Sequence, residues 1–123
     1  MNKPANLNEF YNSLNELGQV VYHQLKALIH QVDPNVCEIL FVSNPYFYLK
    51  DYEKIKPHHR PSIMLVFYKD HVNVFAHAIK AYKSKLDIYK VTDKDTLQIY
   101  YDKPLLEQVL IELFKTSLQP YED

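Results

Sequence analysis

Two apolar-rich segments, 62–68 (SIMLVFY) and 71–77 (HVNVFAH), constrain the fold of this chain more than any other feature. Only Lys69 and Asp70 separate them, which predicts a β-hairpin with a two-residue turn. Side chains alternate between the two faces of a strand. One face is therefore wholly apolar: Ile63, Leu65, Phe67, Val72, Val74 and Ala76. Such a face has to be covered, so we expect helices on one side of an antiparallel sheet.

The opposite face of the same hairpin is mixed. In the register set by the turn, Tyr68 faces His71, Val66 faces Asn73, Met64 faces Phe75 and Ser62 faces His77. A surface that combines aromatic, polar and histidine side chains suits the wall of a groove better than a dry core. We therefore expect this face to remain open.

The helices that would cover the apolar face are predicted near the two ends of the chain. Apolar residues recur every three or four positions from Phe10 to Val32, which predicts one long helix opened by Asn6 and ended at Asp33-Pro34. A C-terminal helix is expected to start at Asp102, as its cap, with Pro104 in the first turn.

The remaining segments complete an α/β (α+β) domain. Segments 37–42, 45–49 and 96–101 are predicted strands, and helical spacing runs through 79–89, although 86–91 fits helix and strand equally. With 123 residues we expect a single compact domain over 1–123, with an antiparallel sheet and helices packed on one face.

Composition excludes several classes of function. Gly18 is the only glycine, so phosphate-binding loops, dinucleotide motifs and the nucleophile elbow are absent, as are the common paired zinc motifs. An enzyme is therefore the less favoured class, since one that used His71 as its acid-base residue would lack a second catalytic group. The formal net charge of -1 and the acidic residues among the basic ones of loop 50–60 argue against a nucleic-acid partner. The single cysteine, Cys37, and the lack of a long apolar run favour a cytoplasmic protein without a membrane contact.

The order of these segments resembles a known family. The best-matching residues are Glu38, Pro45 and Phe47 in the first strand pair, and Lys69, His71 and Phe75 in the second. The chain resembles the YdhG-like family of small bacterial proteins, the domain of unknown function 1801, over nearly its whole length. The resemblance implies a compact α/β domain with helices on one side of an antiparallel sheet.

One branch of that family is described as a frataxin-like intracellular iron chaperone, so the resemblance also implies metal handling. The predicted first helix carries only Glu9 and Glu16 as carboxylates, whereas iron prefers clustered oxygen ligands. A transition-metal site from His58, His59 and His77 is the alternative that geometry allows, since the loop with the first two enters beside the third. Otherwise these histidines are ordinary surface residues, and no other cofactor is expected.

Aromatic side chains give the leading hypothesis, a non-enzymatic binding domain. Alternation places Tyr46 and Tyr48 on the open face. We predict a ligand-binding patch there, formed by Tyr46, Tyr48, Tyr68, His71, Asn73 and Phe75. Tyrosine suits recognition of a small molecule, a protein partner or a second copy of the chain. The open alternatives are that the rings only cover the sheet and that His71 only fixes the hairpin.

Overall fold

The computed structural model describes residues 3–121, which form a six-stranded sheet and four α-helices. The helices are α1 (Leu7–Ser13), α2 (Glu16–Val32), α3 (Ile79–Tyr82) and α4 (Glu107–Ser117). The strands are β1 (Cys37–Phe41), β2 (Asn44–Tyr48), β3 (Ile63–Phe67), β4 (His71–Phe75), β5 (Lys90–Val91) and β6 (Leu97–Tyr100). Short 3₁₀ turns cover Lys50–Tyr52 and Lys83–Lys85.

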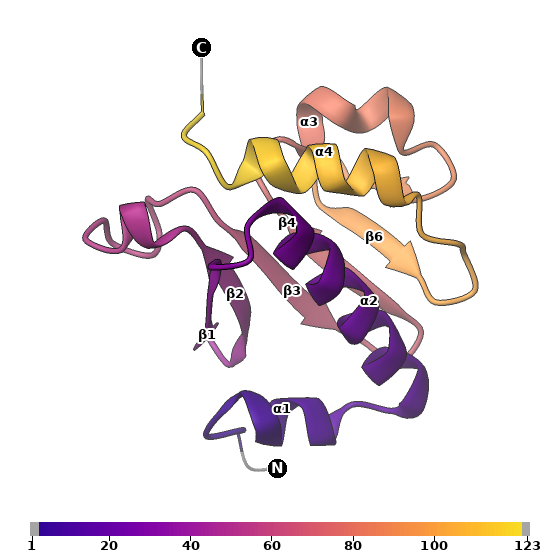
Figure 1. The fold of residues 1–123 in the computed structure, drawn as a ribbon. Coiled ribbons are helices and arrows are strands. Elements are labelled where there is room, and N and C mark those ends of the chain that lie inside the picture. Colours follow the sequence, from indigo (N-terminus) through magenta and orange to yellow (C-terminus); the bar gives the residue numbers. More distant parts are fainter. Residues whose placement is uncertain (1–2, 122–123) are drawn as a thin grey trace.

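All neighbouring strands are antiparallel, in the order β1-β2-β3-β4-β6-β5. Helices α2 and α4 lie side by side against the sheet (Figure 1). The predicted α+β class and the register of the β3–β4 hairpin are confirmed, with Met64 opposite Phe75 and Val66 opposite Asn73. Ser62 and His77 lie just beyond this ladder, so their predicted pairing is not formed.

The core lies between the sheet and these helices. Alternate residues of the central strands point toward the helices and are almost completely buried, as are the facing helix residues: Phe47, Ile63, Leu65, Val72, Val74, Leu97, Ile99, Leu25, Ile29, Leu110, Leu113 and Phe114. Burial of apolar side chains at this interface is the main source of stability. Among residues 3–121, no helix is both long and apolar enough to cross a bilayer.

The prediction of one long N-terminal helix is wrong, because the helix is interrupted after Ser13. Leu14 has extended backbone angles, and the Asn15 side chain caps α2 by accepting a hydrogen bond from the Gly18 amide at 2.8 Å. The Asn15 amide group also donates to the Lys69 carbonyl in the β3–β4 turn at 3.0 Å. A Cβ atom at Gly18 would lie 3.2 Å from the Asn15 Oδ1, so glycine eases this close approach.

The predicted start of the C-terminal helix at Asp102 is also wrong, because α4 begins at Glu107. The hydroxyl group of Tyr89 donates to the Pro104 carbonyl at 2.6 Å and accepts from the Leu106 amide at 2.8 Å. A side chain from another part of the chain thus holds the segment that leads into α4, and the helix itself has no side-chain cap.

Segment 79–91 is mostly turn. Helix α3 is a single turn followed by the 3₁₀ turn, so the helix predicted over 79–89 is confirmed only at its start. Within 86–91, Lys90 and Val91 alone form a strand, which pairs with Gln98 and Leu97 of β6. Leu86 is fully buried and anchors the segment in the core.

Candidate functional site

The sheet face opposite the helices, called the open face below, carries side chains from β2, β3, β4 and β6. Across these strands its residues are Tyr46, Tyr48, Met64, Val66, Tyr68, His71, Asn73, Phe75, Gln98 and Tyr100. Tyr68 and Phe75 are 50% and 38% exposed, whereas the residues of the helix-facing side are buried. This face therefore presents aromatic rings to solvent.

Three rings form a stack at one end of the open face. The His71 ring lies between those of Tyr68 and Tyr100, with centroid distances of 4.8 Å to each and interplanar angles of 11° and 26°. The His71 Nδ1 atom lies 2.7 Å from the Asp70 carboxylate. Because an ionised carboxylate only accepts, Nδ1 carries the proton in this contact and Nε2 is free to accept in a neutral ring.

The hydrogen bond from His71 lowers the pKa of the Asp70 carboxyl below its ordinary value, which keeps that group ionised. The pair orients the imidazole ring within the stack. His71 thus makes a hydrogen bond within the hairpin turn. Such a bond is what we expect if His71 only fixes the hairpin and does not contact a ligand. Tyr100 was not predicted for this site, although the alternation in 96–101 puts it on the same face as His71.

Tyr101 secures the turn beneath this stack. Its hydroxyl group donates to the Tyr68 carbonyl at 2.6 Å, and its amide donates to the Asp70 carbonyl at 3.0 Å. Burial, followed by the nearby Asp70 charge, raises the pKa of Tyr101 to about 12. The phenol therefore stays protonated and continues to donate at pH values where a free tyrosine ionises.

We expect stability to fall as the pH rises through this range. The folded state keeps the Tyr101 proton up to about pH 12, whereas the unfolded chain releases it near the ordinary tyrosine pKa of about 10. The protonated Tyr101 hydroxyl group therefore contributes fully to the free energy of unfolding below pH 10, and this contribution is lost as the pH approaches 12. Urea denaturation at a series of pH values should show the decline, and Tyr101→Phe should make it less steep. An equally steep decline in that variant would contradict the assignment.

Tyr46 and Tyr48 lie on the predicted face, but the prediction that they are exposed is wrong. Only 2% and 6% of their surfaces are exposed, because the loop that follows β2 folds over them. The Tyr46 hydroxyl group donates to the Pro57 carbonyl at 2.7 Å, and the Arg60 guanidinium lies 4.1 Å from the centre of the Tyr48 ring. These two tyrosines support the site from below the loop, and Tyr46 also lines a hollow between the loop and the sheet.

Arg60 fixes the loop by donating to the backbone carbonyls of Glu53 and Ile55. Between this loop and the sheet lies a hollow of about 270 Å³, called the sheet-end hollow below. Its lining includes Phe41, Tyr46, Arg60, Met64, Phe75 and His77. Arg60 is the only arginine of the chain, and it was missed as a site residue because its stacking depends on the path of the loop.

Asn73 lies midway between the hollow and the aromatic stack. Its Oδ1 atom is buried and has no hydrogen-bond partner within residues 3–121. Its neighbours across the strands are Val66 and Gln98. A buried amide oxygen without a partner is uncommon in native proteins, so this atom is an available acceptor if the neighbouring side chains move.

The predicted three-histidine metal site is not formed. His58 packs edge-on against Phe41, with ring centroids 5.2 Å apart, while His77 uses Nε2 to bond the Gln119 carbonyl at 2.7 Å. Across residues 3–121, no three His, Cys, Asp or Glu side chains are placed to hold one metal ion. The histidine prediction, which includes His59, is therefore wrong, and the carboxylate cluster that an iron site needs is not present in this part of the chain.

Comparison with solved structures identifies a similar fold. The crystal structure of a DUF1801 family protein, YdhG from Bacillus subtilis, superposes with a TM-score of 0.71 at 15% sequence identity, covering 90% of this chain and 86% of that one. No family model and no curated protein matches the sequence. The fold implied by the family resemblance is confirmed.

Proposed function

We propose that this chain is a non-enzymatic cytoplasmic binding domain whose open face takes a small planar organic molecule. The observation that carries the proposal is the exposure of Tyr68 and Phe75 on a sheet face that no helix covers. A contiguous apolar patch on a surface marks an interaction site more often than scattered apolar residues do, and the faces of aromatic rings favour stacking with other π systems. The cytoplasmic part of the proposal rests on the single cysteine.

Three features of the open face suit a ligand of one or two rings. The sheet-end hollow has room for a ring against Met64 and Phe75, and Asn73 carries an acceptor without a partner. The stacked Tyr68 and His71 rings offer a flat surface at the other end. An apolar hollow with a few placed polar groups is the usual form of a small-molecule site.

The size of the patch argues against a second copy of the chain. The uncovered strands β3, β4 and β6 have five, five and four residues. At about 3.3 Å per residue and about 4.8 Å between strands, they present roughly 200 Å² of flat area. A stable protein interface buries about 800 Å² on each partner. The patch therefore fits a small ligand, and the homodimer is not proposed.

The test is a titration of ¹⁵N-labelled protein with indole and quinoline, followed through amide chemical shifts. We expect shifts to concentrate on β3 and β4. The double variant Tyr68→Ala/Phe75→Ala should bind about thirtyfold more weakly, because two ring contacts are lost and each is worth on the order of 1 kcal/mol. Ile88→Ala is the control, since Ile88 is 39% exposed but lies outside the sheet. Unchanged binding in the double variant, or shifts confined to the helices, would refute the proposal.

A further inference from the structure

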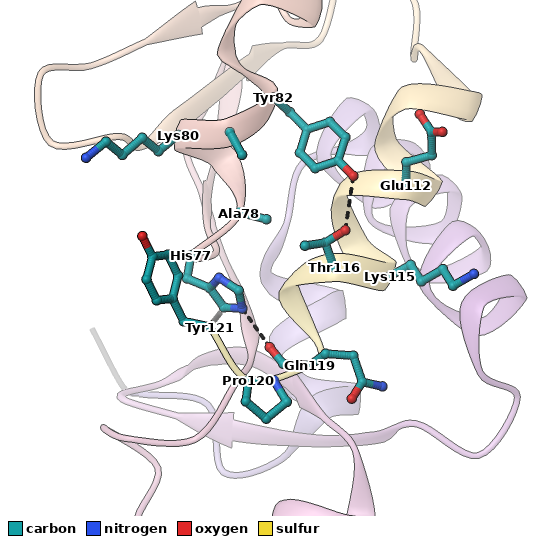
Figure 2. Close-up of a pocket in the computed structure, with 11 residues that line it drawn as sticks. His77, Ala78, Lys80, Tyr82, Glu112, Lys115, Thr116, Gln119, Pro120 and Tyr121 are labelled. Atoms are coloured by element: carbon teal, nitrogen blue, oxygen red, sulfur yellow. Dashed lines mark hydrogen bonds between the residues drawn. The ribbon is translucent and has the colours of Figure 1, made fainter. Parts of the chain in front are cut away.

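A second pocket, called the α3–α4 pocket below, has a volume of about 850 Å³ (Figure 2). It shares His77 with the sheet-end hollow, but its other walls come from α3, the C-terminal part of α4 and the residues that follow it. The apolar part of its lining consists of Ala78, Ala81, Pro120 and the rings of Tyr82 and Tyr121. Its volume falls within the range of about 300–1,000 Å³ that is usual for small-molecule sites.

The polar groups of this pocket can act as both donor and acceptor. The hydroxyl groups of Tyr82 and Thr116 are 3.0 Å apart, and one donates to the other (Figure 2). The pair therefore keeps one hydroxyl proton that can be donated to a ligand. Such a proton suits an oxygen acceptor, for example one oxygen of a carboxylate.

His77 supplies the acceptor. Its Nε2 atom faces the Gln119 carbonyl, which can only accept, so the proton of a neutral ring lies on Nε2 and Nδ1 is an acceptor. Nδ1 is buried and has no partner within residues 3–121. The Tyr121 ring packs edge-on against His77, yet 67% of Tyr121 is exposed. A ring this exposed can take another rotamer without disturbing the core, and such a movement is required to bring a ligand hydroxyl group to Nδ1.

The charged residues of the pocket lie at its rim. Lys80 and Lys115 stand on opposite sides with their ammonium groups directed outward, and Glu112 is the one acidic residue in the lining (Figure 2). Within the described chain, none of the three makes an ion pair. Two cationic side chains against one anionic one leave an excess of one positive charge at the mouth.

We propose that the α3–α4 pocket binds a small aromatic carboxylic acid that also carries a hydroxyl group. The carboxylate accepts a hydrogen bond from the Tyr82–Thr116 pair, and the flexible lysines at the rim attract its charge. The ring packs against Ala78, Ala81, Pro120 and Tyr82, and the hydroxyl group donates to the Nδ1 atom of His77. Apart from His77, this pocket has no lining residue in common with the sheet-end hollow, and the proposal does not depend on the function proposed for the open face.

Three probes separate what the carboxylate and the hydroxyl group of the ligand contribute to binding. They are 4-hydroxybenzoate, benzoate, which lacks the hydroxyl group, and the neutral 4-hydroxybenzamide. Calorimetric titration should give the tightest binding for 4-hydroxybenzoate. The variant Lys80→Met/Lys115→Met should bind it about three- to tenfold more weakly, because exposed ion pairs contribute modestly. The matched variant Lys54→Met/Lys94→Met removes two exposed lysines outside the pocket and should leave binding unchanged.

His77→Gln tests the hydroxyl contact, because a glutamine amide can still donate to the Gln119 carbonyl but does not reproduce Nδ1. The native protein should prefer 4-hydroxybenzoate to benzoate about fivefold, as expected for one hydrogen bond, and His77→Gln should remove that preference. Tyr68→Ala/Phe75→Ala should keep full binding, since both residues lie outside this pocket.

Several outcomes would overturn the proposal. No saturable binding of 4-hydroxybenzoate at millimolar concentration would do so, and so would equal affinity for the neutral amide. Binding that is lost in Tyr68→Ala/Phe75→Ala but kept in the lysine variant would assign the ligand to the open face instead.

Discussion

Replacing Phe47 with alanine is expected to lower the free energy of unfolding by about 3–5 kcal/mol. Phe47 is fully buried, and it lies in β2 on the side of the sheet that packs against the helices. Alanine would leave a cavity that the close-packed neighbours cannot fill. Urea denaturation, followed by circular dichroism, measures the change as a lower transition midpoint.

The matched control is Phe75→Ala, which makes the same chemical change in β4. Phe75 is 38% exposed and lies on the open face, so we expect a loss below about 1 kcal/mol. If the Phe47→Ala protein does not fold, Phe47→Leu should still show a measurable loss. Equal destabilisation by the two alanine variants would mean that the two faces of the sheet have been assigned wrongly.

Glu38→Ala is the second change with a large expected effect, about 2–3 kcal/mol of stability. The Glu38 carboxylate accepts hydrogen bonds from the Tyr22 hydroxyl group and, at 2.9 Å, from the Lys26 ammonium group. Only 7% of the Glu38 side chain is exposed. These bonds join α2 to β1, so their loss weakens the attachment of the helix to the edge of the sheet.

The cost of Glu38→Ala arises mainly at Tyr22, which is 3% exposed and would keep a hydroxyl group without its acceptor. Burial and the hydrogen bond to Glu38 both raise the pKa of Tyr22, so its phenol remains a donor in the native state. Lys26 contributes less to the loss, because 43% of its side chain is exposed and water can replace the carboxylate.

Two comparisons make this prediction specific. Glu38→Gln keeps an acceptor for Tyr22 and should cost only about 1 kcal/mol. Lys83→Ala removes the exposed contact with Asp95, 3.7 Å long, and should change stability by less than about 0.5 kcal/mol. Thermal and urea denaturation should show the largest loss of stability for Glu38→Ala, a smaller one for Glu38→Gln and the smallest for Lys83→Ala. A Glu38→Ala protein as stable as Lys83→Ala would show that the buried network contributes little.

Short-range patterns were enough to predict the sheet and its two faces. Alternation over 62–77 predicted the β3–β4 register, and the same rule correctly directed Phe47 toward the helices. It also put Tyr68, His71 and Phe75 on the opposite face. These features follow from the sequence because a strand repeats every two residues and a two-residue turn fixes the pairing of its neighbours.

Features that depend on residues far apart in the chain were predicted wrongly. The apolar spacing continues through Leu14, so it could not reveal that Asn15 caps a new helix and bonds the Lys69 carbonyl. In the same way, the start of α4 depends on the Tyr89 hydroxyl group. Both boundaries are set by partners that local periodicity does not contain.

The open face likewise has some features that follow from neighbouring residues and others that depend on residues far apart in the chain. Which aromatic side chains share a face could be read from the sequence, because it follows from alternation along each strand. In contrast, the folded chain was needed to show that Arg60 and its loop cover Tyr46 and Tyr48, and that His58 and His77 contact different neighbours. The path of a loop results from many weak contacts with distant residues, and a short run of sequence does not encode it.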